Sequence, residues 1–127
     1  MSGNGYLTKL ITDLLYEIGA FTILITSIII LWQSNLLLLT AVIIQCLVAL
    51  WFWHERFDVT FFFVISIFGT FAEWVFVRSG IWHYSNPSLF GIPIWFPVAF
   101  GTTALIGQRL AITITEMWDT IAPPMNI

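Results

Sequence analysis

The sequence predicts an all-α integral membrane protein with four transmembrane helices in two antiparallel hairpins. Hydrophobic residues make up 59% of the 127 residues and charged residues only 9%, whereas soluble domains carry roughly 25% charged residues. The apolar residues also fall into long runs that short polar turns separate. Because so little polar surface cannot cover a water-soluble globule, a lipid bilayer is the expected solvent. The whole chain, residues 1–127, is short enough for one domain.

The first span is expected to carry an amphipathic N-terminal helical extension. Lys9, Asp13 and Glu17 recur every four residues and share one helix face, while leucine and isoleucine cover the other. This extension can lie along the membrane surface or form the wet end of a long first helix. The apolar run at residues 20–32 is short for a span, which needs about 20 residues. The span must therefore include one or two helical turns that precede Gly19, and we expect a bend at Gly19.

Three further spans are predicted at residues 36–53, 59–77 and 94 to about 115. The polar triplet at 33–35 is a very short turn, so the second span should run antiparallel to the first. The segment at 54–58 forms the next turn and holds the densest charge in the chain.

Small residues in the last two spans predict close helix packing. Gly69 and Ala72 are spaced so that another helix can approach the third span, and Gly101 and Gly107 offer the same in the fourth. Pro97 falls in the first turns of the fourth span, where a missing N–H group costs least.

Four helices place both termini on the same side of the membrane. With the termini in the cytoplasm, Lys9 and Arg56 lie inside and Arg78 outside, so the positive-inside rule favours cytoplasmic termini by one cation. The net charge of −3 and the lack of clustered cations argue against nucleic-acid binding. The expected partners are the lipid bilayer and further copies or other subunits in a homo- or hetero-oligomer.

Glu73 is the candidate catalytic residue. It lies within the third apolar run, and an acid at membrane depth is a functional hypothesis by default. An apolar pocket would favour its neutral form, which can donate a proton to an alkene or an alcohol. His83 belongs to the same end of the molecule and is its candidate hydrogen-bonding partner. The alternative is an acid near the interface that snorkels or caps a loop amide.

An aromatic set near Glu73 is the candidate ligand-binding group. Its members are Trp74, Trp82, Tyr84, Trp95 and Phe96. They can line a pocket for a flat apolar ligand, or they can form the aromatic belt that membrane proteins carry at the interface.

Other polar residues are expected to be structural. Arg109 should pair with Asp58 or Glu55, or snorkel to the interface. His54 and Asp58 share a helical spacing, but His83 should lie at the opposite membrane face, so we predict no metal site and no cofactor.

The loop after the third span resembles a loop of membrane-embedded carotenoid enzymes. Gly80-Ile81-Trp82-His83-Tyr84, then Pro87, then Gly91-Ile92-Pro93 are similar to the Gly-x-Trp-x-aromatic turn and the Gly-x-Pro helix re-entry of small-subunit lycopene cyclases and carotenoid hydratase-like proteins. The resemblance covers about a quarter of the chain and implies that an active unit needs a partner subunit. Those cyclases follow the proline with an acidic pair, where this chain has Ile94 and Trp95, so only Glu73 can supply the acid.

Two functions follow as hypotheses. The first is a small polytopic membrane protein that binds or modifies an apolar, isoprenoid- or carotenoid-like ligand, with Glu73 as the acid. The second is a noncatalytic accessory subunit of a larger membrane complex. The dense Glu73–Gly101 stretch favours the first, and the scarcity of polar groups in the spans favours the second. A transporter ranks third, because the sequence lacks repeats and pairs of broken helices.

Overall fold

The computed structural model describes residues 3–122 and is built from four α-helices. They are α1 (Gly3–Leu31), α2 (Asn35–Phe52), α3 (Arg56–Arg78) and α4 (Phe96–Ile121). Each is long and apolar enough to cross a membrane. The all-helical prediction is confirmed, and α2 and α3 end within three residues of the predicted spans. The fourth helix is longer than predicted and continues to Ile121.

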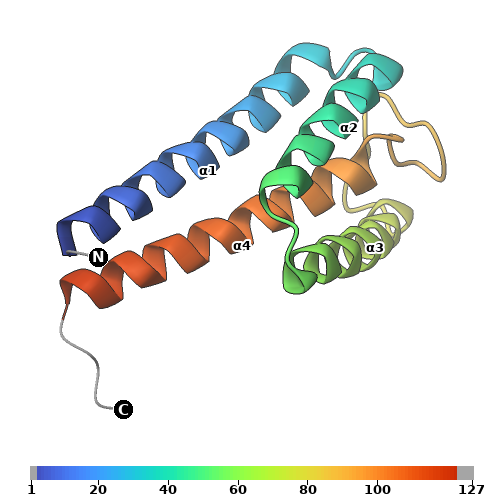
Figure 1. Ribbon diagram of the computed structural model, residues 1–127. Coiled ribbons are helices and arrows are strands. Elements are labelled where there is room, and N and C mark those ends of the chain that lie inside the picture. The colour runs from blue at the N-terminus through green and yellow to red at the C-terminus, as the bar shows by residue number, and fades with distance from the viewer. Residues whose placement is uncertain (1–2, 123–127) are drawn as a thin grey trace.

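The first helix is a single long rod. α1 continues through Gly19 as one α-helix of 29 residues, so the amphipathic segment is the N-terminal part of a long first helix. At 1.5 Å per residue it is about 43 Å long, which exceeds the roughly 30 Å of a bilayer's hydrocarbon core. α1 runs alongside α4 (Figure 1), and Tyr6 donates a hydrogen bond of 3.1 Å to Glu116 near the far end of α4. The start of α1 and the end of α4 therefore lie together.

α4 is the central helix of the described fold. It packs against each of the other three helices, whereas α3 packs mainly on α4 and stands apart from α1 in Figure 1. A buried hydrophobic cluster lies where α1 and α2 meet the first half of α4. Its buried members are Leu24, Leu38, Val42, Trp95, Ala99 and Ile106.

Two glycines allow α3 and α4 to approach closely. A Cβ atom at Gly69 would overlap the ring of Phe100, and one at Gly101 would lie 2.8 Å from Cε2 of Phe62. Both are therefore packing points, as the sequence predicted. Gly107 is not, because a Cβ atom there would meet no atom within 4 Å.

Local signals set the helix ends. The Ser34 side chain accepts a hydrogen bond from the Leu37 N–H group at the start of α2, which is a typical N-cap. Pro97 lies in the first turn of α4, as predicted, where a backbone N–H group would have no partner within the helix.

The outer surface is strongly apolar, with large side chains such as Ile30, Trp51 and Phe68 mostly exposed.

Candidate functional site around Glu73

The end of α3 directs the chain back over Glu73. Gly80 has a φ of 80°, and its N–H group donates to the Val77 carbonyl while the Ile81 N–H group donates to the Phe76 carbonyl. These two bonds form a Schellman motif, which requires a residue in the left-handed conformation after the helix. Glycine adopts that conformation without a steric penalty. The helix therefore ends where the sequence predicted, and the loop that follows folds back along its last turns.

Glu73 holds this loop through one carboxylate oxygen. Its Oε1 atom accepts hydrogen bonds from Trp82 Nε1 at 2.6 Å and from the Tyr84 hydroxyl at 2.5 Å. Both donors come from the loop, nine and eleven residues beyond the acid. Hydrogen bonds from neutral donors stabilise a carboxylate more than a carboxylic acid. The geometry therefore gives Glu73 a loop-anchoring role, as the acceptor for both donors.

Tyr84 is held as the protonated partner of this pair. Burial, the hydrogen bond to Glu73 and the negative charge of Glu73 together raise the pKa of the Tyr84 hydroxyl far above its ordinary value. The ring also packs edge-on against Phe96, with the centroids 6.1 Å apart. Tyr84 therefore connects the acid of α3 to the first turn of α4.

A tight turn at the tip of the loop strains one aromatic residue. The backbones of Leu89 and Ile92 exchange hydrogen bonds of 2.9 and 3.1 Å across Phe90 and Gly91. Both central residues have positive φ, 53° at Phe90 and 80° at Gly91, as a type I′ turn requires. Gly91 suits its position, but phenylalanine rarely adopts positive φ. The Phe90 side chain is nevertheless 75% exposed.

An apolar groove of about 580 Å³ lies between this turn, α3 and the start of α4. Thr70 is the only residue with a side-chain oxygen among those that line it, and its hydroxyl is buried without a hydrogen-bond partner. The lining residues are Ile67, Thr70, Phe71, Trp74, Leu89, Phe90, Ile92, Pro93, Ile94 and Pro97. The volume and the apolar lining are typical of a groove that holds an apolar ligand.

The other end of the loop is fixed to the α1–α2 turn. Asn35 donates hydrogen bonds of 2.7 Å to the Asn86 carbonyl and to the Ser88 hydroxyl, and it accepts one of 3.1 Å from Trp95 Nε1. Asn86 in turn donates to the carbonyl groups of Trp32 and Gln33. These bonds hold the loop at both ends, so the Phe90 turn projects from a fixed base.

The structure divides the predicted aromatic set between different surroundings. Trp74 lines the groove, and the Arg78 guanidinium lies over its ring at 5.8 Å. Trp82 and Tyr84 bind Glu73. Phe96 contacts the Tyr84 ring and also stacks on Phe100, with centroids 5.2 Å apart, whereas Trp95 is buried in the core.

His83 lies between the two donors of Glu73 in sequence but does not share their role. Among residues 3–122, no hydrogen bond joins it to Glu73, and its side chain is exposed. It borders a separate hollow of about 300 Å³ beside Trp32 and Trp95. Within the same described range, no three His, Cys, Asp or Glu side chains come together as a metal site.

The predicted partner of Arg109 is confirmed. Arg109 of α4 binds both carboxylate oxygens of Asp58 in α3, and Glu55 lies 4.0 Å from its Nη2 atom. Asp58 is only 1% exposed and also accepts hydrogen bonds from Gln108 Nε2 and from the Glu55 N–H group. These donors compensate for the burial of the charge.

Sequence reasoning missed a second buried acid. Glu17 is 1% exposed, and the Thr113 hydroxyl of α4 binds both of its carboxylate oxygens. Its spacing with Lys9 and Asp13 suggested that all three residues lie on one solvated face. Lys9 and Asp13 do, and they form an exposed ion pair at 3.2 Å, but Glu17 does not. A stripe of polar residues four apart does not reveal where a neighbouring helix covers it, so no signal in α1 alone identifies Glu17.

No family model, curated protein or solved structure matches this chain. The resemblance of the Gly80–Pro93 loop to carotenoid enzymes therefore stays a prediction.

Proposed function

We propose that this chain is a multi-pass membrane protein that binds an elongated apolar ligand of isoprenoid or carotenoid type in the groove beside the Phe90 turn. In this proposal Glu73 is a positioning residue. It holds Trp82 and Tyr84 and thereby the loop that completes the groove. Glu73 would also act as an acid if a ligand reaches its carboxylate.

The observation that carries the proposal is the strained and exposed Phe90. A left-handed conformation costs a non-glycine residue about 1–2 kcal/mol, and such strain concentrates at functional sites. The turn places this ring on the wall of a 580 Å³ apolar groove. A contact with a bound ligand accounts for a phenylalanine where asparagine would suit the turn better.

The Phe90→Asn variant tests this proposal. Asparagine followed by glycine is the preferred sequence of a type I′ turn, so the loop should be retained while the groove loses one aromatic wall. We expect the purified protein to retain added β-carotene through gel filtration, and Phe90→Asn to bind it about tenfold more weakly, since burying one aromatic ring is worth roughly 1.5–3 kcal/mol.

The matched control is Ile81→Asn. Ile81 is an exposed apolar residue of the same loop that does not line the groove, so this variant should bind β-carotene like the unmodified chain. Equal binding by Phe90→Asn and the unmodified chain, or equal loss in both variants, would reject the groove as the site.

The helix contacts also support a specific membrane topology within this proposal. The N-terminal half of α1 and the C-terminal half of α4 lie together. This contact is consistent with four membrane crossings in two hairpins, with both termini on the same side of the membrane. We propose that this side is the cytoplasm. The Asp119→Cys and Ser85→Cys variants should then react with an impermeant maleimide from opposite sides, with the unmodified chain, which holds only Cys46, as the control. Labelling of both from the same side would overturn this topology.

The accessory-subunit hypothesis is favoured by one observation. α3 packs mainly on α4, and it presents Phe57, Phe68 and Phe71 outward. These rings can contact lipid or another subunit. Purification only in a stable complex with larger membrane proteins, with no bound apolar ligand, would support this alternative.

A further inference from the structure

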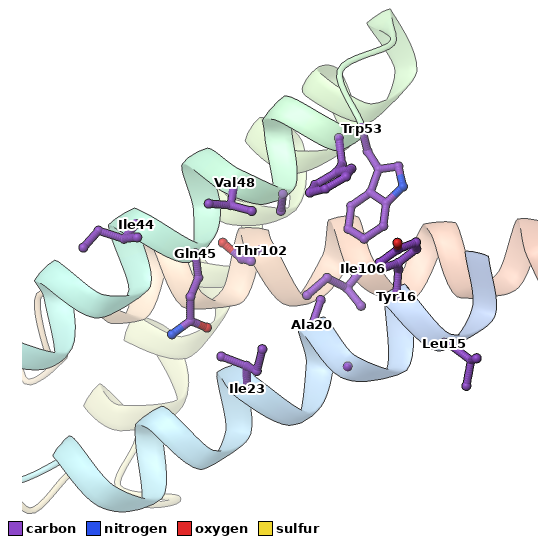
Figure 2. A pocket seen from close by; sticks show the side chains of 13 residues that line it. Leu15, Tyr16, Ala20, Ile23, Ile44, Gln45, Val48, Trp53, Thr102 and Ile106 are labelled. Carbon is purple, nitrogen blue, oxygen red and sulfur yellow. The ribbon is translucent and has the colours of Figure 1, made fainter. Parts of the chain in front are cut away.

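A second cavity lies on the other side of α4 from the groove. It has a volume of about 380 Å³ and opens between α1, α2 and α4. Figure 2 shows the side chains that point into it. They are Tyr16 and Ala20 of α1, Gln45 of α2, Trp53 just after α2, and Ile106 of α4. None of the residues that line it belongs to the Glu73 loop or to α3.

The cavity exists because small residues face it from two helices. Gly19 and Ala20 on α1 and Ala49 on α2 leave space that larger side chains would fill. A Cβ atom at Gly19 would meet no atom within 4 Å. The rings of Tyr16 and Phe52 stack with centroids 6.1 Å apart, so two helices that diverge here still meet at one end of the cavity.

One polar group in the wall is left without a partner, and the hydrogen bonds around it fix its orientation. The Ser27 hydroxyl donates its hydrogen to the Ile23 carbonyl at 2.8 Å, so its oxygen can only accept from Gln45. The amide nitrogen of Gln45 must therefore face Ser27, at 2.7 Å, and the Oε1 atom must face away. This oxygen is buried and has no hydrogen-bond partner.

In Figure 2 the amide of Gln45 lies between α2 and α1, with the oxygen on the side of Ile23. A buried carbonyl oxygen that lacks a donor destabilises the fold, so a ligand that supplies one gains affinity. A hydroxyl that enters the cavity beside Gln45 would supply the donor that this oxygen lacks.

We propose that this cavity binds an apolar alcohol from the bilayer, with the ligand hydroxyl donating to Gln45 Oε1 and the hydrocarbon body against Gly19, Ala49 and Ile106. Lys and Arg are absent from the lining residues, so a carboxylate or phosphate headgroup finds no counter-charge. A ligand without a donor would leave the amide oxygen unpaired. This site is separate from the proposed carotenoid groove, and neither depends on the other.

Competition binding with matched ligands tests the inference. A diazirine-bearing long-chain fatty alcohol would be crosslinked to the full-length protein in nanodiscs, and unlabelled fatty alcohol or its methyl ether would compete. The alcohol should compete about two- to tenfold better than the ether, which lacks only the donor, because one hydrogen bond contributes roughly 0.5–1.5 kcal/mol. Equal competition would overturn the proposed hydrogen bond.

Two variants separate the cavity from the hydrogen bond. Gly19→Leu should fill the cavity and abolish crosslinking, whereas Gly107→Leu, at a glycine that is equally open but outside the cavity, should leave it unchanged. Gln45→Leu should keep crosslinking but remove the preference for alcohol over ether. Crosslinking that survives Gly19→Leu, or a preference that survives Gln45→Leu, would overturn the site.

Discussion

At the scale of single residues, Glu73 is defined by the two loop donors that it binds. The Glu73→Gln variant removes the charge from both hydrogen bonds but keeps the size of the side chain. We expect the free energy of unfolding in mixed micelles to fall by about 1–3 kcal/mol, which is the usual contribution of hydrogen bonds to a charged group. Asp119→Asn makes the same chemical change at an exposed acid and should alter stability little. Equal effects of the two variants would contradict the anchoring role.

Tyr84 gives the same contact a pH dependence. The pKa of its hydroxyl is raised, first by burial and then by Glu73, so the folded protein retains this proton at a pH where an unfolded chain with a tyrosine pKa of 10.0 loses it. The stabilisation is therefore fully present below about pH 10 and is lost as the pH rises further. A tyrosinate absorbance titration should show a tyrosine that ionises last, well above pH 10, and Tyr84→Phe should remove this last step. Ionisation of all tyrosines near pH 10 would contradict this.

At the scale of elements, the buried ion pair fixes α3 to α4. Asp58→Asn should destabilise the protein by roughly 3–5 kcal/mol, because it leaves the Arg109 charge without its buried partner. Asp58→Leu combined with Arg109→Met removes both charges and should be much less destabilising than the sum of the single changes. Unfolding measurements on the singles and the double variant check this, and additive effects would indicate that the pair is not coupled.

Two glycines of α4 form a matched pair for close packing. In Gly101→Ala the new methyl group would lie 2.8 Å from the buried Phe62 ring and must displace it, so we expect a loss of about 1–3 kcal/mol. Gly107→Ala meets open space and should stabilise the helix by up to about 1 kcal/mol. Thermal unfolding of the two variants gives the signs. If both variants changed the unfolding temperature in the same direction, α3 and α4 would not approach each other at Gly101 as closely as the structure shows.

At the scale of the whole molecule, hydropathy and turn chemistry predicted four helices and most of their boundaries, because a span must keep about 20 residues apolar. The antiparallel order of the helices also sufficed to pair Arg109 with Asp58. The burial of Glu17 could not be predicted, since it depends on which face of α1 the neighbouring helix covers.

The candidate site was predictable in composition but not in arrangement. Glu73 and its aromatic neighbours stand out in the sequence, yet the path of the loop decides which of them meet. The Schellman motif at Gly80 and the type I′ turn at Gly91 bring Trp82 and Tyr84 to Glu73 and Phe90 to the groove. Trp95 is drawn into the core instead by its bond to Asn35. Such convergence depends on the loop backbone, which residue type alone does not determine.

The central claim is that the protein binds an apolar isoprenoid-type ligand within the membrane. The most direct test is purification in mild detergent, followed by native mass spectrometry, an absorption spectrum and lipid extraction of the same peak. We predict a discrete small oligomer that carries a polyene or another isoprenoid. A ligand-free protein, or one recovered only with larger partner subunits, would contradict the claim and leave the accessory-subunit role.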